Sequence, residues 1–298
     1  MAEVDIDGHQ LRLTNLDKPL YPGGFTKGQV VDYYARIAEV MLPHVGDRPL
    51  TLRRFPDGVE ADGFFEKESP SHRPAWVRTV AVPSGRRGVV NYTIADSRAV
   101  IVWLANLAAL ELHPLLARAS ALDVPACMVF DLDPGAPADI VGATEVALRV
   151  RDRLDELGLE SVAKVSGSKG IHVYVPLNTD TSFDDTKGFA NAFARLLEKE
   201  DPKRVTSVMT KSERKGKVFV DWSQNDDSKT TVAVYSLRAT GEPHVSAPVS
   251  WDELDAALQT RDASALRFSP DEVLSRVEAR GDLFAPLEAL RQKLPTFD

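Results

Sequence analysis

The clearest pattern of hydrophobic and polar positions lies in the middle of the chain. A short apolar run that starts at Cys127 ends in the polar and turn-forming residues 131–135, which predicts a buried strand that stops at a Pro-Gly turn. The alternation in this region predicts strands at 128–133, 161–166, 171–177 and 218–222, and helices at about 139–157 and from a capping box at Ser182. The order strand, helix, strand, strand, helix, strand is that of a ferredoxin-like unit, which RNA-recognition modules and polymerase palms also use.

The flanking regions carry the same periodicities less regularly. Before residue 127 they predict a short strand from Leu11, a helix from Thr26 to about Leu42, a strand at 49–58 with Arg53 near its end, a hairpin at 82–92, and an apolar helix at 103–116. After residue 222 they predict a strand at 230–238, a helix capped by Ser250 and an acidic helical C-terminal segment. We therefore expect a two-layer α+β (α/β) fold in one domain over 1–298: an N-terminal αβ lobe at 1–125, a βαββαβ core at 126–240 and a helical segment at 241–298.

The composition is that of an ordinary globular protein, with 43% hydrophobic and 27% charged residues among 298. The single cysteine, Cys127, excludes an internal disulfide and a cysteine-based zinc cluster. The sequence has no run of eighteen apolar residues, and its acidic N-terminus lacks an apolar leader. We therefore expect no membrane partner, no export and a cytoplasmic location.

Charge is unevenly distributed along the chain. The net charge of −8 argues against general coating of nucleic acid, but residues 203–217 carry six basic side chains against the single acid Glu213. Residues 252–298 carry ten acids against six bases. The basic stretch could bind an anionic partner locally, and a merely solvated loop is equally compatible with charge alone.

Asp131 and Asp133 are the strongest candidates for chemistry. Residues two apart on a strand project from the same face, and two carboxylates this close repel each other unless a cation lies between them. Such a pair at a strand end is typical of sites for hard divalent ions. Alone, an Asp-x-Asp before a Pro-Gly turn more often bonds the backbone of that turn. The βαββαβ order favours the metal site over the turn, because its fourth strand flanks the first and brings Asp221 to the same face.

The turn at residues 167–170 is expected at the same end of the sheet as these aspartates. Its glycines allow backbone N–H groups to converge, and the side chains of Ser166, Ser168 and Lys169 add donors, which suits a triphosphate. His172 opens the next strand. Three carboxylates, a phosphate-binding turn and a basic loop on one sheet face together favour a metal-dependent phosphoryl-transfer site.

Two further groups are candidates for nucleic-acid contacts. Lys18 and Lys27 flank the start of the first helix, where free backbone N–H groups favour an anion; chance placement of surface lysines is the alternative. Phe64 and Phe65 are adjacent on a strand, so one of them should be exposed beside Lys67 and stack on a base, unless a neighbouring segment covers it.

Several motifs resemble one family over nearly the whole chain. Residues 130–134 (Phe-Asp-Leu-Asp-Pro), 166–172 (Ser-Gly-Ser-Lys-Gly-Ile-His) and 218–221 (Val-Phe-Val-Asp) resemble the three active-site motifs of the archaeo-eukaryotic primase superfamily, and within it those of the polymerase domain of bacterial DNA ligase D. Stretches at 13–18, 63–67, 111–114 and 235–238 are also similar to that family. The resemblance implies a primase-polymerase fold and a role in non-homologous end joining. Leu115 and residues 240–244 depart from the usual family pattern.

The resemblance also implies roles for individual residues. Asp131, Asp133 and Asp221 would bind two catalytic divalent ions, Mn²⁺ or Mg²⁺. The incoming nucleotide would be held by Ser166, Ser168, Lys169, Gly170, His172, Arg214, Arg238, His113 and Arg53. The DNA and its 5'-phosphate would be contacted by Asn15, Lys18, Lys27, Phe64, Phe65, Lys67, Arg86 and Arg87. From its position before Pro114 alone, His113 is instead expected to cap a helix end.

The implied activity is template-directed nucleotidyl transfer that fills short gaps or extends ends in bacterial double-strand-break or excision repair. The implied partners are DNA with a gap or 3'-overhang and a 5'-phosphate, NTP or dNTP, a separate ATP-dependent DNA ligase for a stand-alone member, and Ku, all in the nucleoid. One alternative is a primase that starts chains de novo. Another is a non-catalytic module that binds 5'-phosphorylated DNA ends, which three packed carboxylates near a phosphate backbone argue against.

Overall fold

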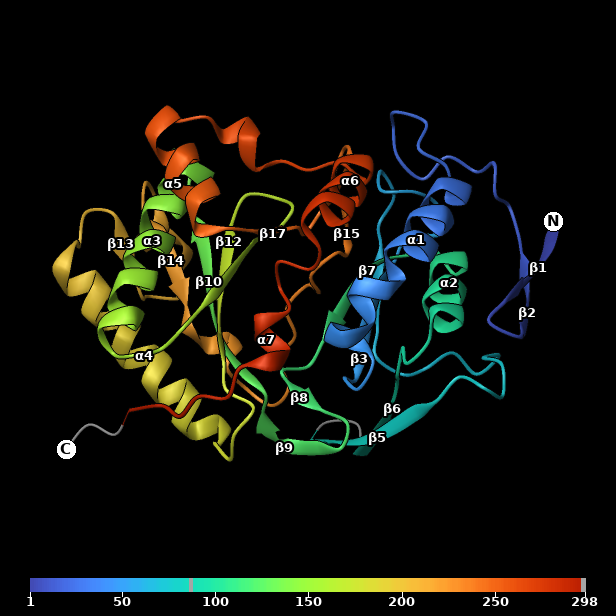
Figure 1. Ribbon diagram of the computed structural model, residues 1–298, viewed down its shortest axis with the longest axis horizontal. Helices are drawn as coiled ribbons and strands as arrows, with labels where there is room; N and C mark the ends of the chain where they lie inside the picture. The colour runs from blue at the N-terminus through green and yellow to red at the C-terminus, as the bar shows by residue number, and fades with distance from the viewer. Residues whose placement is uncertain (86–87, 296–298) are drawn as a thin grey trace. The chain divides into compact units, whose positions relative to one another are not determined.

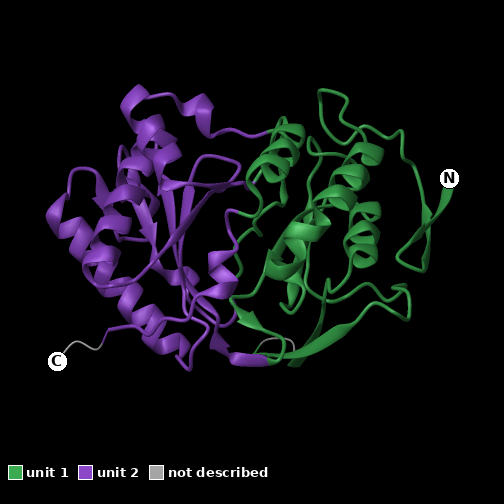
Figure 2. Ribbon diagram, in the orientation of Figure 1, with its two compact units in different colours: residues 1–120, 230–245, 269–282 green, residues 121–229, 246–268, 283–298 purple. Residues whose placement is uncertain are grey.

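The computed structural model describes residues 1–85 and 88–295 (Figure 1). The chain forms two compact units, each assembled from segments that are distant in sequence (Figure 2). The first unit takes residues 1–120, 230–245 and 269–282, and the second takes residues 121–229, 246–268 and 283–298.

The second unit contains the predicted βαββαβ core. Its elements are β9 (Ala121–Pro125), β10 (Cys127–Pro134), α3 (Ile140–Glu156), β11 (Val162–Val165), β12 (Ile171–Pro176), α4 (Phe183–Glu200), β13 (Val205–Thr206), η1 (Lys211–Arg214), β14 (Val218–Asp221), η2 (Trp222–Gln224), β17 (Pro248–Val249), α5 (Trp251–Thr260), η3 (Ala263–Leu266) and α7 (Pro286–Ala289). The sheet order is β13-β14-β10-β12-β11-β17, so the first core strand, β10, lies between the third and the fourth as the topology predicts. The short strands β13 and β17 extend the sheet at its two edges.

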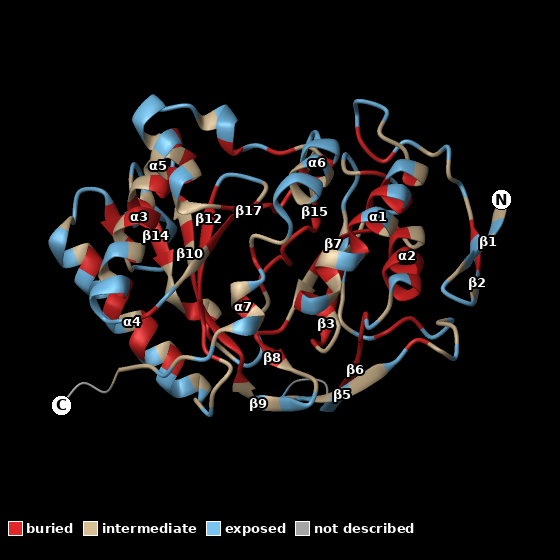
Figure 3. Ribbon diagram, viewed as in Figure 1, coloured by how far each residue is buried: buried red, intermediate tan, exposed pale blue. Residues whose placement is uncertain are grey.

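Alternation along β10 separates its two faces. Met128, Phe130 and Leu132 are fully buried, and Phe130 packs on Phe193 of α4 with ring centroids 4.9 Å apart. Helices α3 and α4 both contact β10 and cover this apolar face (Figures 1 and 3). The polar residues of β10 therefore point to the opposite face of the sheet.

The helices of the second unit begin where the sequence predicts. Asp139 caps α3, and Ser182 forms a capping box with Asp185 at the start of α4. Ser250 forms a capping box with Glu253 at the start of α5. The predicted boundaries of the core elements are thus confirmed to within about two residues.

The first unit contains a different sheet. Its elements are β1 (Ala2–Ile6), β2 (His9–Leu13), α1 (Lys27–Val45), β3 (Leu50–Arg54), β4 (Phe64–Glu66), β5 (Thr79–Ser84), β6 (Gly88–Thr93), α2 (Arg98–Asn106), β7 (Ala109–Pro114), β8 (Ala117–Arg118), β15 (Leu237–Ala239), β16 (Pro243–Val245) and α6 (Pro270–Arg280). The order β4-β3-β6-β5 forms one sheet, and β7 also pairs with β3. Helix α1 starts at a capping box of Thr26 and Gln29 and runs through Pro43 to Val45, three residues beyond the predicted end.

The predicted helix at 103–116 is wrong beyond Asn106, and the helix that is present, α2, begins earlier, at Arg98. Helix α2 ends at Asn106, Ala108 adopts a left-handed φ of 56°, and strand β7 follows. Ala109, Leu110 and Leu112 are all buried, so the segment has no alternation that distinguishes a strand from a helix. Pairing with β3 decides the outcome, and His113 is a strand residue instead of a helix cap.

The predicted strand at 230–238 is also wrong over most of its length, because only Leu237–Ala239 forms a strand, β15. Tyr235 just before it adopts a left-handed φ of 66°. The buried Tyr33 hydroxyl donates to the Tyr235 carbonyl at 2.8 Å, and the Tyr235 hydroxyl donates to Asp282 at 2.6 Å. These tertiary bonds hold a backbone turn where the sequence pattern indicates a straight strand.

In the described part of the chain, no helix combines the length and the apolar character that crossing a membrane requires.

Candidate active site

The polar face of the second unit's sheet carries a row of charged side chains. Asp221 on β14 lies opposite Asp131 on β10, Asp131 lies opposite His172 on β12, and His172 lies opposite Lys164 on β11. Residues opposite each other on neighbouring strands share a face, and so does Asp133, two positions after Asp131. The predicted convergence of the three aspartates on one sheet face is therefore present, and the buried Lys164, which sequence reasoning missed, ends the row.

Two aspartates of this row are already bound by neighbouring side chains. Asp131 Oδ1 lies 3.3 Å from His172 Nε2, and His172 is buried. The Asp221 carboxylate accepts hydrogen bonds from Ser223 N at 3.0 Å, Ser223 Oγ at 2.6 Å and Gln224 Nε2 at 2.9 Å, because it caps the short helix η2. The sequence pattern gave no sign of this capping role.

The electrostatics of the row suit a divalent cation. Burial and the charge of Asp131 raise the pKa of Asp133, Lys169 and Arg214 lower it, and Asp221 adds to the rise. A cation between these carboxylates would offset their repulsion, and carboxylate oxygens are the ligands that hard divalent ions prefer. Within residues 1–85 and 88–295, no three carboxylate, imidazole or thiol groups are gathered round one point for metal coordination. The donor set therefore fits a divalent ion by its chemistry. Asp221 Oδ1 already accepts two hydrogen bonds from Ser223, and Oδ2 accepts one from Gln224, so one acceptor site remains on Oδ2.

The turn at 167–170 lies against the end of β10, as predicted. A Cβ placed on Gly170 would stand 2.6 Å from the Leu132 carbonyl oxygen and 3.6 Å from Asp133 Oδ1. Lys169 Nζ donates to the Pro134 carbonyl at 3.2 Å. Only a residue without a side chain at position 170 permits this approach.

Ser166 organises the same turn from within. Its Oγ accepts hydrogen bonds from Ser168 N at 3.3 Å and Gly170 N at 3.1 Å. These two N–H groups are therefore not free donors, contrary to the expectation of an open nest of backbone N–H groups. Lys169 and Ser168 are exposed and remain the outward-facing donors of the turn.

The basic stretch 203–217 also reaches this end of β10. A Cβ on Gly135 would stand 2.1 Å from the Arg214 carbonyl oxygen, and Gly135 N donates to the Lys217 carbonyl at 2.8 Å. The Arg214 guanidinium lies 3.6 Å from the ring centroid of Phe219, which is opposite Asp133 in the register. Arg214 is thereby placed on the same sheet face as the carboxylates.

The first unit contains a second cluster of predicted site residues, gathered round Glu111. Arg53, His113 and Arg238 each approach its carboxylate, and we call these four residues the Glu111 cluster. The register explains the placement, because Arg53 lies opposite Glu111 on β3 and His113 follows two residues later on β7. Glu111 itself carried no role in the sequence prediction.

Buried tyrosines of α1 hold the two segments that form this cluster. The Tyr34 hydroxyl donates to the Leu110 carbonyl at 2.7 Å and accepts from Leu237 N at 3.1 Å. The Tyr21 hydroxyl donates to the Arg238 carbonyl at 2.9 Å. The strand that carries Glu111 and the strand that carries Arg238 are thus fixed by the same helix and the segment before it.

Phe64 and Phe65 are both exposed, at 44% and 62%, where only one was expected to be. Strand β4 lies at the edge of its sheet, and each ring contacts the arginine opposite it on β3: Arg54 lies 5.3 Å from the Phe64 centroid and Arg53 lies 5.3 Å from the Phe65 centroid. Lys67 follows β4 and is half-buried.

The lysines at the start of α1 lie close together, but the reason given for an anion site there is partly wrong. Lys27 N and Gly28 N donate to the carbonyls of Lys18 and Leu16, so these N–H groups are not free. Burial, and then the charges of Lys18 and Arg54, lower the pKa of Lys27, which shows that three cations share this corner. Asn15 precedes them with a left-handed φ of 53°.

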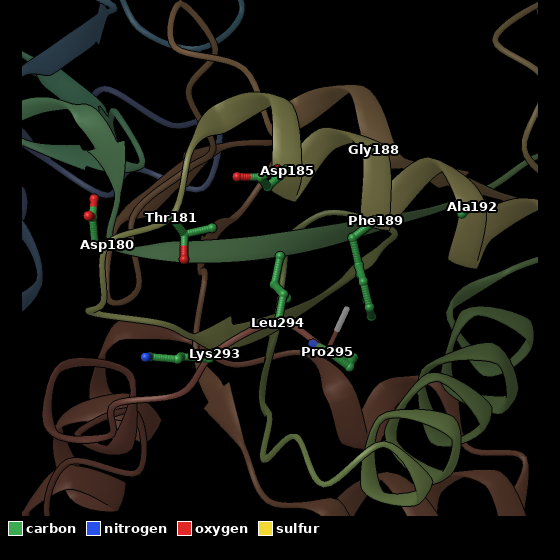
Figure 4. Close-up of a pocket in the computed structure, with 9 residues that line it drawn as sticks. All are labelled: Asp180, Thr181, Asp185, Gly188, Phe189, Ala192, Lys293, Leu294 and Pro295. Carbon is green, nitrogen blue, oxygen red and sulfur yellow. The ribbon is translucent and has the colours of Figure 1, made fainter. Parts of the chain in front are cut away.

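Two other features complete the account of the predicted site. Arg86 and Arg87, at the tip of the predicted hairpin between β5 and β6, lie outside the described residues. A surface pocket of about 450 Å³ in the second unit lies between α4 and residues 293–295 (Figure 4). None of the predicted site residues is among the described residues that line it.

The chain is similar to known proteins over most of its length. Residues 26–284 match the family model described as "LigD, primase-polymerase domain". The chain is 45% identical over 295 residues to the multifunctional non-homologous end joining protein LigD of Mycolicibacterium smegmatis, covering 97% of this chain and 38% of that protein. It is 28% identical to the bifunctional LigD protein of Bacillus subtilis, covering 91% of this chain and 43% of that protein. The chain therefore spans less than half the length of these two relatives.

A solved structure is similar over almost its whole length. The polymerase domain from Mycobacterium tuberculosis ligase D, in complex with DNA, superposes with a TM-score of 0.87 and 44% sequence identity. The match covers 95% of this chain and 99% of that one.

Proposed function

Because the chain belongs to the LigD primase-polymerase domain family, we propose that it extends DNA primers across short gaps and at 3'-overhangs during non-homologous end joining. Its enzyme class is that of a DNA-directed nucleotidyltransferase. The predicted primase-polymerase fold is confirmed by the likeness to the ligase D polymerase domain. The observation that carries the proposal is the row of Asp221, Asp131 and His172 across one sheet face, with the 167–170 turn at its edge.

The members of this family use divalent metal ions, and Asp131, Asp133 and Asp221 are the residues that would hold them, as Mn²⁺ or Mg²⁺. When bound, such ions lower the pKa of the primer 3'-hydroxyl and offset the charge of the reacting phosphates. His172 orients the Asp131 carboxylate through the 3.3 Å contact.

The residues round the carboxylates would bind the triphosphate. Lys169, Ser168 and Arg214 supply positive charge and donors at the end of β10, and Ser166 keeps the turn of Gly170 in shape. In the first unit, Arg53, His113 and Arg238 would bind nucleotide phosphates. We expect ribonucleotides and deoxyribonucleotides both to be accepted.

The first unit would bind DNA. Lys18 and Lys27, with Asn15, would hold the 5'-phosphate on the downstream side of a gap, and Phe64 and Phe65 would stack on template bases beside Lys67. Arg86 and Arg87 would contact the primer or the second DNA end. An ATP-dependent DNA ligase activity and Ku would act with the protein on DNA in the cytoplasm, at the nucleoid.

The proposal is tested by primer extension on a short gap with Mn²⁺, with and without a 5'-phosphate on the downstream strand. Wild type should extend the primer, and the 5'-phosphate should stimulate extension. Asp131→Ala should abolish extension without changing DNA binding. The matched control Asp201→Ala removes a carboxylate that pairs with Arg149 at 2.9 Å and should extend like wild type.

Two other outcomes would each support one of the alternative functions. Phosphate-dependent DNA binding without extension by wild type would leave a non-catalytic end-binding module. Synthesis from single-stranded template without any primer would make the protein a primase that starts chains de novo.

A further inference from the structure

Glu111 is a buried carboxylate with an unusual number of partners. Its Oε1 lies 3.2 Å from Arg53 Nη1, 3.3 Å from Arg238 Nε and 3.0 Å from Ala239 N, and its Oε2 lies 2.9 Å from His113 Nε2. The residue is 1% exposed. Burial would raise the pKa of Glu111, but the hydrogen bond from His113 and the charges of Arg238 and His113 outweigh it and lower the pKa to about 2. Glu111 is therefore ionised at any physiological pH.

A buried charge is costly, so its retention points to a function beyond packing. Leu110 and Leu112 on either side of Glu111 are buried, so Glu111 is a charged residue within an otherwise apolar stretch of β7. A leucine at position 111 would leave Arg53 and Arg238 facing each other without a counter-charge. The carboxylate thus brings two guanidinium groups to one place that their mutual repulsion would otherwise keep apart.

Each partner uses only part of its hydrogen-bonding capacity on Glu111. Within the described residues, Arg238 Nε makes an ion pair with Glu111 but no hydrogen bond, and the Arg238 side chain is 18% exposed. Arg53 contacts Glu111 through Nη1, and its side chain is 32% exposed. Two arginines against one carboxylate leave one net positive charge, so donors and charge remain for an anionic ligand.

The Glu111 carboxylate also determines which ring nitrogen of His113 carries the proton. An ionised carboxylate only accepts hydrogen bonds, so the Nε2 facing it must carry the proton. Burial lowers the pKa of His113, although Glu111 opposes this, so the ring is neutral near pH 7 and its Nδ1 is an acceptor. The exposed Phe65 ring packs edge-on against His113 with centroids 5.8 Å apart, and this places the cluster next to the molecular surface.

We propose that Glu111 is a positioning residue for the incoming nucleotide: it holds Arg53 and Arg238 as a preformed pair of cations for the phosphates and fixes the tautomer of His113. This inference rests on the proposed function, because it takes the ligand of the cluster to be the nucleoside triphosphate. A preformed cluster lowers the entropy cost of nucleotide binding, and binding of the DNA does not depend on it.

The test compares Glu111→Gln and Glu111→Asp with wild type and with the control Asp201→Asn. Glu111→Gln keeps the shape but removes the charge, so the KM for the nucleotide and its Kd by calorimetry should rise about tenfold or more. The kcat should stay within about threefold, and the Kd for gapped DNA should not change. Glu111→Asp keeps the charge on a shorter stem and should recover part of the loss, which a purely structural role would not predict.

A double-mutant cycle with Arg238→Ala makes the test specific. If Glu111 acts through Arg238, adding Glu111→Gln to Arg238→Ala should change the nucleotide Kd by less than about threefold. The inference would be overturned if the effects of the two substitutions on the nucleotide Kd multiply in the double variant. It would also be overturned if Glu111→Gln lowers the melting temperature and leaves the nucleotide Kd unchanged. If Glu111→Gln does not fold, the comparison of Glu111→Asp with wild type decides it by the same criteria.

Calorimetric nucleotide binding needs no catalysis, so the two proposals fail separately. A wild type that binds nucleotide but never extends a primer refutes the polymerase function and leaves the role of Glu111 to be judged by the Kd values. A wild type that extends primers, with Glu111→Gln binding nucleotide equally well, refutes only the role of Glu111.

Discussion

Gly170 offers the sharpest test of how the 167–170 turn meets strand β10. Its φ is not in the left-handed region, so Gly170→Ala adds no backbone strain and acts only through the new Cβ. That atom would stand 2.6 Å from the Leu132 carbonyl oxygen, about 0.8 Å short of the 3.4 Å at which ordinary contact begins. The obstacle is backbone in the middle of the sheet, so the turn must move, at a cost of about 1–3 kcal/mol.

The expected signature is a modest loss of stability with a larger loss of activity. At roughly 2–4 °C per kcal/mol the melting temperature should fall by about 2–12 °C. A displacement of nearly 1 Å of Lys169 relative to Asp133 should lower kcat/KM for primer extension by about ten- to a hundredfold. Both quantities are measured on purified protein, by differential scanning calorimetry and by extension on a gapped substrate.

Gly188→Ala is the matched control for this substitution. Gly188 lies inside α4, its φ is ordinary and a Cβ there meets nothing within 4 Å. Alanine should stabilise the helix by up to about 1 kcal/mol and leave extension unchanged. A Gly170→Ala protein with the melting temperature and the extension rate of wild type would refute the close approach of the turn to β10.

Three further predictions concern the first unit. The pKa of Glu111 is about 2 in the folded protein and its ordinary value is 4.5, so its ionisation contributes about 3 kcal/mol of stability, which is present above pH 4.5 and lost as the pH falls toward 2. In urea unfolding, the difference in stability between wild type and Glu111→Gln should therefore narrow below pH 4.5. A difference that stays constant with pH would contradict the lowered pKa of Glu111. Tyr34→Phe leaves Leu110 O and Leu237 N without their buried partner, so the free energy of unfolding should fall by about 1–3 kcal/mol, against no change if water replaces the hydroxyl. In a fluorescence titration, Lys27→Met should weaken binding of gapped DNA that carries a 5'-phosphate and leave binding of the unphosphorylated gap unchanged. Equal weakening of both would show that Lys27 does not bind the 5'-phosphate.

The catalytic core was predictable because local signals there agree with one another. Alternation along β10, the caps at Asp139 and Ser182 and the order of elements together define a βαββαβ unit. Topology then places Asp131 beside Asp221 without any knowledge of side-chain contacts. To place the three carboxylates on one face, only the strand order and the two-residue period of a strand were needed.

The family resemblance named Arg53, His113 and Arg238 as nucleotide-binding residues, but their convergence on Glu111 was not predictable, for the opposite reason. Residues 109–112 and 231–237 are buried at every position, so neither segment has a period that separates strand from helix or turn. Their conformations are decided by partners far away in sequence: Arg53 lies 58 residues from Glu111, and Tyr33 lies 202 residues from Tyr235. The capping of η2 by Asp221 was likewise invisible, because a single aspartate gives no sign of whether it faces a cation or the backbone.

The interleaved course of the chain has a consequence for how the protein is made and divided. The first unit takes residues 230–245 and 269–282 from beyond the start of the second, and Glu111 meets Ala239 only after 128 further residues have been synthesised. Until then Glu111 and Arg53 lack Arg238, so the Glu111 cluster completes late during translation. A cut of the gene between residues 120 and 121 should yield an N-terminal fragment that lacks β15 and α6, so the first unit would be incomplete in both fragments. The C-terminal fragment would contain every segment of the second unit.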